Sequence, residues 1–203
     1  EAGTYNVTAT VNGCTGPAGT VAVTVAPPPA APTAGSNSPL CEGDDLNLTA
    51  GAVAGATYSW TGPNGFTSTQ QNPTIAGVTS AETGTYSVSA IVGGCQGPAG
   101  SVAVTVNPIP TTPVASSNSP ICIGQTINLS TTAVAGATYS WTGPNGFTSA
   151  QQNPSITNAT TAESGTYSLT ITVNGCTSAA GTVDVTVNNA PPSPTVSSNS
   201  PVC

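Results

Sequence analysis

The stretch AVAGATYSWTGPNGFTS occupies residues 52–68 and returns without a substitution at residues 133–149, which is a shift of 81 residues. The six cysteines keep the same step in two series: Cys14, Cys95 and Cys176, then Cys41, Cys122 and Cys203. The 203 residues therefore hold about two and a half copies of one 81-residue repeat. Self-similarity at a fixed period is typical of structural units built in tandem.

Proline-rich segments recur at one phase of the repeat, at residues 26–33, 107–113 and 188–194. Proline cannot donate to a β-ladder and stiffens the chain, so these segments are predicted to be short semi-rigid linkers. They divide the chain into four parts. The parts are the end of one repeat (1–26), two complete repeats (33–107 and 114–188) and the first strand of another (195–203).

Between linkers, short alternating strands are separated by Gly, Asn and Pro clusters, and no helical period is present. The predicted strands of the first complete repeat lie near 33–40 and at 46–50, 56–60, 73–78, 84–92 and 101–106. The motif GPNG (62–65) predicts the tight turn after the third of them, with Asn64 and Gly65 at positive φ. The pattern predicts an all-β fold in which each repeat forms a β-sandwich.

The charge composition excludes several function classes, because the chain has no Lys, Arg or His and its only charged side chains are seven carboxylates. Binding of nucleic acid requires cations that neutralise phosphates. A Ser-His-Asp arrangement or a histidine base cannot be built. No run of 18 apolar residues occurs in this segment, so membrane insertion is not expected here. We therefore predict no enzyme activity, no cofactor and no nucleic-acid partner.

The run AETGTYSV (81–88) resembles the tyrosine corner of immunoglobulin-like domains, and Trp60 resembles their strand C tryptophan. The resemblance covers both complete repeats and implies tandem Ig-like sandwiches arranged as beads on a string. It assigns core positions to Trp60, Tyr86, Trp141 and Tyr167. The chain departs from the antibody pattern at the two positions of the buried disulfide, which hold Ala50 and Val88.

More narrowly, the ordered motifs SNSPxC, YSWTGPNGFTS, QNPxI, GTYS and GGC/NGC resemble the Ig-like and PKD-like repeats of very large surface proteins of Bacteroidota, which are exported by the type IX secretion route. This resemblance implies a secreted protein, extracellular or on the cell surface. The predicted function is a structural tandem-repeat protein that forms a surface fibre, stalk or adhesin shaft. Its partners would be neighbouring repeats and, through Val- and Thr-rich edge strands, other copies in a filament.

The fixed cysteine positions lack the CxxC spacing of zinc sites and favour disulfides. Two pairing schemes stay open. One joins Cys41 to Cys95 and Cys122 to Cys176 within each domain. The other joins Cys41 to Cys176 between consecutive domains, because in an immunoglobulin topology the turns that hold Cys41 and Cys95 lie at opposite ends of the sandwich.

The sequence also contains candidates for calcium, glycan attachment and carbohydrate-binding sites. The turn EGDD places Glu42, Asp44 and Asp45 together as candidate calcium ligands, although the next repeat reads IGQT there, which favours an exposed acidic turn without metal. Candidate N-glycosylation sequons lie at Asn6, Asn47, Asn128 and Asn158. The alternative function is a carbohydrate-binding or spacer module of a large secreted adhesin or enzyme, with surface glycans as partners and Phe66 as the aromatic to test.

Overall fold

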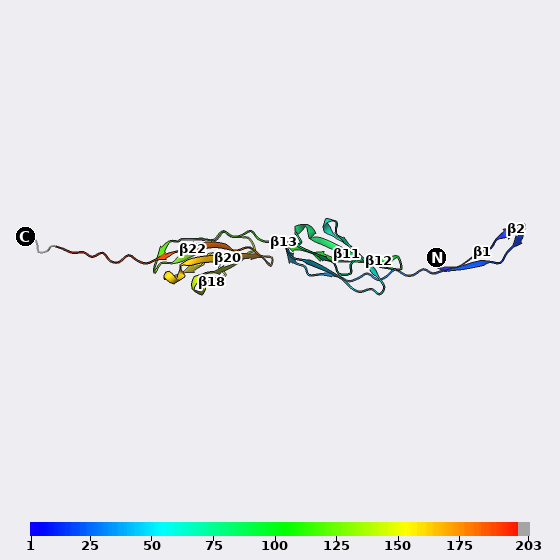
Figure 1. Ribbon diagram of the computed structural model, residues 1–203, viewed down its shortest axis with the longest axis horizontal. Coiled ribbons are helices and arrows are strands. Elements are labelled where there is room, and N and C mark those ends of the chain that lie inside the picture. Colours follow the sequence, from blue (N-terminus) through cyan, green and yellow to red (C-terminus); the bar gives the residue numbers. More distant parts are fainter. Residues whose placement is uncertain (199–203) are drawn as a thin grey trace, which may run out of the picture. The chain divides into compact units, whose positions relative to one another are not determined.

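A computed structural model describes residues 1–198, and this part of the chain contains β-strands and four short 3-10 helices but no α-helix (Figure 1). The chain divides into two compact units, Glu1–Val106 and a second that begins at Asn107. The first unit contains an N-terminal hairpin and one sandwich, here the first domain. The second unit contains the second domain. Residues 199–203, with Cys203 and most of the strand predicted at 195–203, lie outside the described residues.

The first domain packs two sheets against each other. One sheet has the order β10 (Thr74–Ile75), β7 (Leu46–Ala50), β5 (Ala34–Ser36), and the other has β12 (Cys95–Val104), β11 (Gly84–Val92), β8 (Thr57–Thr61), β9 (Thr67–Ser68). A two-stranded pair of β6 (Leu40–Cys41) and β13 (Val106–Asn107) completes it. The 3-10 helices η1 (Pro63–Gly65) and η2 (Ser80–Glu82) lie between strands.

The second domain repeats this plan. Its smaller sheet has the order β14 (Ser116–Ser117), β16 (Ile127–Ser130), β19 (Ser155–Ile156). Its larger sheet contains β18 (Thr148–Ser149), β17 (Thr138–Thr142) and β20 (Gly165–Val173), with β21 (Cys176–Thr177) and β22 (Gly181–Val185) both paired to β20. The pair of β15 (Ile121–Cys122) and β23 (Val187–Asn188) is parallel, and the 3-10 helices are η3 (Pro144–Gly146) and η4 (Thr161–Glu163).

The N-terminal hairpin has the same pairing as the end of a complete domain. The strand β1 (Gly3–Val7) pairs with β4 (Gly19–Val23), and β2 (Thr10–Val11) pairs with β3 (Cys14–Thr15). Tyr5 is 50% exposed, whereas Tyr86 and Tyr167 at the same repeat position are fully buried. The hairpin therefore shows the same repeat residues in the absence of a surrounding core, and it can be compared with the two domains.

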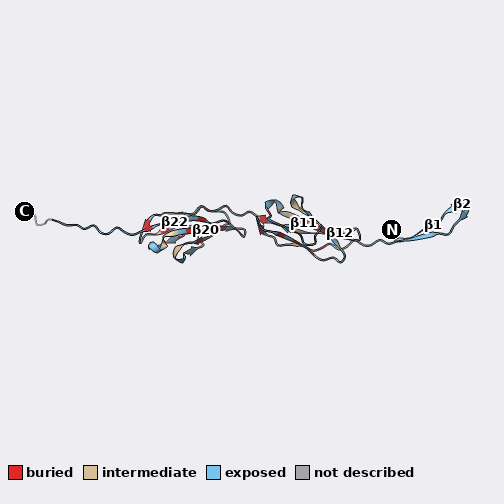
Figure 2. Cartoon of the chain, in the orientation of Figure 1, coloured by how far each residue is buried: buried red, intermediate tan, exposed pale blue. Residues whose placement is uncertain are grey.

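Each domain has one core of buried residues (Figure 2), and each core includes a buried tryptophan, Trp60 or Trp141. The alternation of LNLTA turns Leu46, Leu48 and Ala50 inward, and all three are buried. Trp60 lies opposite Val88 in the β8–β11 ladder, and Trp141 lies opposite Leu169 in the β17–β20 ladder. Val88 and Leu169, which take the strand F place of the antibody cystine, are thus cross-strand partners of the tryptophan in the same buried core.

The predicted strand at 73–78 is mostly wrong, since only Thr74–Ile75 is a strand. Gly77 has φ 59°, which ends the extended conformation before Val78. The short strand β9 was not predicted, because Thr67–Ser68 carries no alternation long enough to read. The positive φ values predicted for Asn64 and Gly65 are confirmed at 54° and 73°.

The C-terminal part of the proline-rich segments 26–33 and 107–113 packs on the domain that follows each of them. The carbonyl oxygen of Pro32 occupies the place where a side chain at Gly100 would lie, and Pro113 has the same relation to Gly181. Thr33 also accepts a hydrogen bond at its carbonyl from the Gly51 amide, at 2.8 Å. Only glycine permits this close approach, so these glycines anchor the linkers.

Candidate functional site

The tyrosine corner joins the GPNG turn to the start of β11. The Tyr86 hydroxyl donates to the carbonyl oxygen of Glu82 at 3.0 Å, and the ring packs edge-on against Phe66 with centroids 5.5 Å apart. The Asn64 side-chain amide donates to Glu82 Oε1 at 2.9 Å. The second domain repeats these contacts, with Tyr167 donating to Glu163 at 2.9 Å and Asn145 donating to Glu163 at 2.8 Å.

The carboxylate of Glu82 forms a capping box with Thr79, whose backbone N–H donates to Oε2 at 2.7 Å. Hydrogen bonds that stabilise a charged carboxylate lower its pKa. The pKa of Glu82 therefore lies below its ordinary value, mainly because of the hydrogen bond from the Thr79 backbone amide and next because of the bond from the Asn64 side chain. The pKa of Glu163 is lowered, chiefly by the Thr160 amide. Burial raises the pKa of Tyr86, and the nearby Glu82 charge adds to this. These shifts arise from turn construction, and no reactive pair of groups results.

The motif QNP holds the central tryptophan and strand β7 together. The Trp60 indole N–H donates to the carbonyl oxygen of Gln71 at 3.2 Å, and the Gln71 side chain donates to the carbonyl oxygen of Ala50 at 2.8 Å. Asn72 Oδ1 accepts from the Ala50 amide at 3.0 Å. Gln71 and Asn72 thus provide hydrogen-bond partners for the carbonyl and the amide of Ala50, the buried last residue of β7.

The acidic turn EGDD uses each carboxylate on a different backbone amide. Asp44 Oδ2 accepts from the Cys41 amide at 2.9 Å, Asp45 Oδ1 from the Gly77 amide at 3.0 Å, and Glu42 Oε1 from the Ser80 amide at 3.2 Å. No group of three His, Cys, Asp or Glu side chains that could hold a metal ion occurs in residues 1–198.

The turn IGQT (123–126) of the second domain shows how the acidic residues of EGDD can be replaced. The Gln125 side-chain oxygen accepts from the Cys122 amide at 2.8 Å, which is the bond that Asp44 makes in the first domain. An uncharged oxygen therefore serves the same purpose as a carboxylate. What the position requires is a hydrogen-bond acceptor, whereas calcium prefers charged oxygen ligands.

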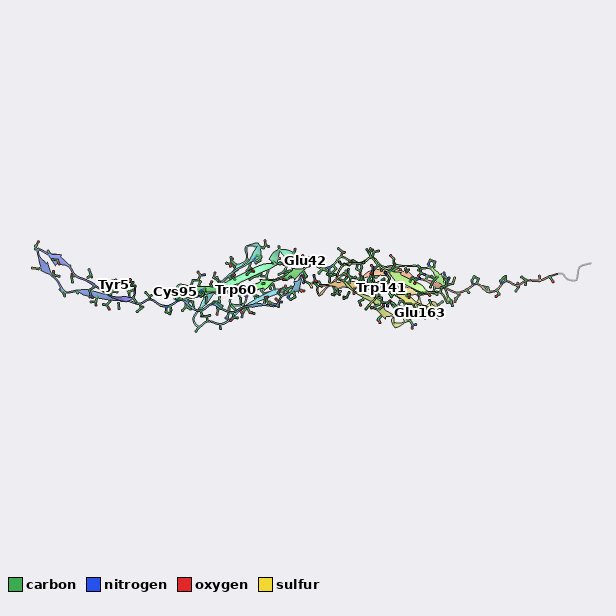
Figure 3. The ribbon with its side chains drawn as sticks, turned by 180° about the vertical axis from the view of Figure 1, so that it is seen from behind. Tyr5, Glu42, Trp60, Cys95, Trp141 and Glu163 are labelled. Carbon is green, nitrogen blue, oxygen red and sulfur yellow. The ribbon has the colours of Figure 1, made fainter. Side chains whose placement is uncertain are left out.

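The cysteines do not form the within-domain pairs. Cys41 and Cys176 are disulfide-bonded, while Cys14, Cys95 and Cys122 are free thiols. The pairings Cys41–Cys95 and Cys122–Cys176 are therefore corrected. The physical reason is distance, since Figure 3 shows Glu42, the neighbour of Cys41, and Cys95 at opposite ends of the first domain.

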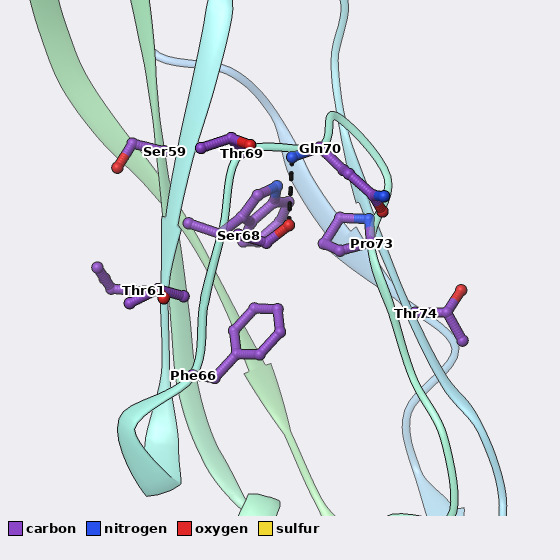
Figure 4. Close-up of a pocket in the computed structure, with 10 residues that line it drawn as sticks. Ser59, Thr61, Phe66, Ser68, Thr69, Gln70, Pro73 and Thr74 are labelled. Atoms are coloured by element: carbon purple, nitrogen blue, oxygen red, sulfur yellow. Dashed lines mark hydrogen bonds between the residues drawn. The ribbon is translucent and has the colours of Figure 1, made fainter.

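A groove of about 530 Å³ opens beside β9 in the first domain. Figure 4 shows that its lining includes the hydroxyl side chains of Ser68, Thr69 and Thr74, the Gln70 amide and the Phe66 ring. Trp60 and Pro73 also line it. Trp60 is only 1% exposed and its N–H is already bonded, and Phe66 is half-buried against Tyr86. The short strand β9, which the sequence pattern missed, contributes Ser68 to this groove, and Phe66 lies directly before it.

The four sequon asparagines are all exposed. Asn47 already accepts a hydrogen bond from the Thr74 hydroxyl at 2.8 Å, whereas Asn158 lies in a loop with φ 53°. Glycosylation at any of them stays a prediction. In residues 1–198 no helix is long and apolar enough to span a membrane.

The family model for the Ig-like domain described as CHU_C associated matches twice, at residues 29–108 and 110–189. The chain belongs to this Ig-like family. The tandem match confirms the expected all-β fold and the resemblance to tandem Ig-like repeats. The Ig-like fold is typically non-catalytic. No curated protein matches the sequence.

Several solved structures resemble the chain, all at low sequence identity. The N-terminal eight Ig domains of Down Syndrome Cell Adhesion Molecule match with a TM-score of 0.56 and 14% identity, over 93% of this chain and 28% of that one. Murine CEACAM1b matches with a TM-score of 0.46 and 14% identity, over 78% and 100%. Drosophila OTK extracellular domains 3–5 match at 0.45 and 16%, over 94% and 72%. The likeness to the Down Syndrome Cell Adhesion Molecule structure supports the Ig fold of the CHU_C-associated domains.

Proposed function

We propose that the chain is a structural segment of an extracellular fibre, stalk or adhesin shaft built from tandem Ig-like domains. One observation carries the proposal: the residues that the two domains share make the same internal contacts, shifted by 81 residues. The bond from Tyr86 to Glu82 recurs from Tyr167 to Glu163, and the indole of Trp141 donates to Gln152 as Trp60 does to Gln71. The shared sequence is thus accounted for by fold construction.

The acids support a non-catalytic role. Six of the seven carboxylates accept hydrogen bonds within their own domain: Glu42, Asp44, Asp45, Glu82, Glu163 and Asp184. The hydrogen bonds to Glu82 and Glu163 lower the pKa of both carboxyls, which makes these two groups poorly suited to donate or accept a proton near neutral pH. We therefore infer that the chain is not an enzyme.

An extracellular location is part of the proposal. Disulfide-bonded cysteines favour an oxidising compartment, and the likeness to the Ig domains of a cell adhesion molecule agrees with it. The motif resemblance to surface proteins of Bacteroidota gives the proposed source and the type IX export route. In such a protein, neighbouring repeats are the first partners, and other copies of the chain are the second.

Negative-stain electron microscopy of the native material, taken from the cell surface or medium, tests the proposal. Continuous fibres or long stalks with a regular axial repeat are the expected result. Isolated flexible chains that each end in a distinct globular head would refute a fibre and make these domains spacers. Labelling with an antibody raised against this segment ties the observed fibres to this chain, and pre-absorbed antibody is the control.

The groove beside β9 favours carbohydrate binding as a second candidate function. Its volume of about 530 Å³ lies in the range of small-ligand sites, and hydroxyl and amide groups suit a hydroxyl-rich ligand. A polysaccharide array probed with the whole chain is the test. Retention that is lost in Thr69→Trp, which fills the exposed rim, and in Phe66→Ala would support a site. Unchanged retention in both variants, or none in the parent, would refute it.

A further inference from the structure

Asparagine followed by glycine occurs four times in the chain, each time at an exposed turn with the asparagine at positive φ. The asparagine φ values lie between 49° and 54°, and the pairs are Asn12–Gly13, Asn64–Gly65, Asn145–Gly146 and Asn174–Gly175. Glycine has no Cβ, so its backbone nitrogen is open to a close approach by the preceding asparagine side chain. All four asparagines are therefore candidates for deamidation.

In deamidation the glycine backbone nitrogen attacks the asparagine side-chain carbon Cγ. The nitrogen loses its proton, the new N–C bond closes a succinimide ring, and the bond from Cγ to Nδ2 breaks with release of ammonia. Water then adds to one of the two ring carbonyls and opens the ring to aspartate or isoaspartate, with no change of oxidation state. The attack requires the side-chain carboxamide to turn towards the glycine nitrogen.

The second domain contains two of the pairs, and one of their carboxamides is held in place. Asn145 Nδ2 donates to Glu163 Oε1 at 2.8 Å, while Oε2 of the same carboxylate accepts from the Thr160 backbone amide at 2.8 Å. Rotation of the Asn145 carboxamide would break a hydrogen bond to a charged group that is itself fixed. The deamidated side chain would also lie beside the Glu163 carboxylate, where two negative charges repel each other.

The other pair of the second domain lacks this restraint. Asn174 and Gly175 form the two-residue loop between β20 and β21, in which Val173 pairs with Cys176. Within residues 1–198 the Asn174 side chain makes no hydrogen bond, so its carboxamide is free to turn. The first domain has Gly93–Gly94 in the same loop, both at positive φ, so the turn itself does not require an asparagine.

We propose that Asn174 is a deamidation site and that the hydrogen bond from Asn145 to Glu163 protects the other Asn-Gly pair of the same domain. The rest of the chain shows the same contrast. Asn64 donates to Glu82 Oε1 at 2.9 Å, whereas the Asn12 side chain makes no hydrogen bond in the described part of the chain. Deamidation is thus confined to the turns at Asn12 and Asn174 and spares the turns beside the two tyrosine corners.

The reaction changes the turn between β20 and β21. Both products add a negative charge there, and isoaspartate also adds one atom to the backbone of the loop. A two-residue hairpin loop fits only a few turn geometries, so the longer backbone weakens the pairing of Val173 with Cys176. The modified fraction therefore rises with the age of a molecule, whatever the function of the chain.

Incubation of the whole folded chain at mildly alkaline pH, in water enriched in heavy oxygen, tests the proposal. Each deamidation incorporates one oxygen atom from the water, and thermolysin digestion followed by mass spectrometry measures it at each site. Residues 52–68 and 133–149 are identical, so the peptides of Asn64 and Asn145 are measured as one pool. The Asn174 peptide should convert at least about tenfold faster than this pool, which is the factor that one hydrogen bond to a charged group provides.

Two further arms separate the hydrogen bond from the local sequence. In urea that unfolds both domains, the Asn174 peptide and the pool should convert at similar rates. In Glu163→Ala one of the two asparagines of the pool should convert faster, and Glu163→Gln, which keeps an acceptor oxygen, should fall between Glu163→Ala and the parent. Tryptophan fluorescence checks that both variants are folded.

The comparison within the parent chain decides the proposal without any variant. Equal conversion of Asn174 and the pool in the folded parent would overturn it. A difference that persists unchanged in urea would also overturn it, because the hydrogen bond to Glu163 would then not be the cause.

Discussion

Removal of the Tyr86 hydroxyl is the sharpest test of the tyrosine corner. In Tyr86→Phe the buried ring and its contact with Phe66 remain, while the 3.0 Å bond to the Glu82 carbonyl is lost. A hydrogen bond of this kind contributes about 0.5–1.5 kcal/mol, and leaving a partly buried acceptor without its donor adds to the loss. We expect the first domain to lose about 1–2 kcal/mol of unfolding free energy.

The chain contains its own control. Tyr5 holds the same repeat position and donates to the Glu1 carbonyl at 3.1 Å, but it is 50% exposed. Water replaces that bond at little cost, so Tyr5→Phe should change stability by less than about 0.5 kcal/mol.

Urea denaturation monitored by tryptophan fluorescence is the assay, in a Trp141→Phe background so that Trp60 reports the first domain alone. A second arm uses pH. The pKa of Tyr86 is raised by burial, so its contribution is complete below the unfolded pKa of about 10 and is lost as pH rises through the higher folded pKa. The unfolding free energy of Tyr86→Phe should therefore fall less steeply at alkaline pH than that of the parent chain. Equal effects of Tyr86→Phe and Tyr5→Phe would refute the reasoning.

Three further predictions concern the same turns. In Gly62→Ala the added methyl group would clash with the Tyr86 ring, so the free energy of unfolding should fall by about 1–3 kcal/mol in the same urea assay. An unchanged urea midpoint would contradict the described packing. Asp44→Asn should be nearly neutral because Gln125 makes the same bond with an amide oxygen, whereas Asp44→Ala should lower the melting temperature; a rise in that temperature on adding calcium would contradict the structural role. The lowered pKa of Glu82 stabilises the fold above its unfolded pKa of about 4.3, and this part is lost as pH falls through the folded pKa, so Glu82→Gln should flatten the acid limb of the pH–stability curve.

The sequence predicted what depends on period and turn chemistry. The repeat length, the all-β class and the positive φ of Asn64 follow from local signals that act within a few residues. The bonding state of Cys41 stayed open, because it depends on which strand ends share an end of the sandwich. The groove beside β9 could not be predicted, since Ser68 and Pro73 approach only after the chain folds back between them.

The chain has few charged residues, and neutral polar side chains form many of the hydrogen bonds to its backbone groups. Asn37 accepts from the Asn47 amide at 2.9 Å, and Asn118 accepts from the Asn128 amide at 2.8 Å. In residues 1–198 no buried side-chain nitrogen or oxygen lacks a hydrogen-bond partner. Hydrogen bonds between neutral groups neither titrate nor weaken with salt screening, unlike surface ion pairs. Five of the seven acids accept hydrogen bonds in turns, and Gln125 at the position of Asp44 indicates that the negative charge is dispensable there. A domain stabilised in this way holds its geometry across changes of salt, which is the property that the proposed shaft requires.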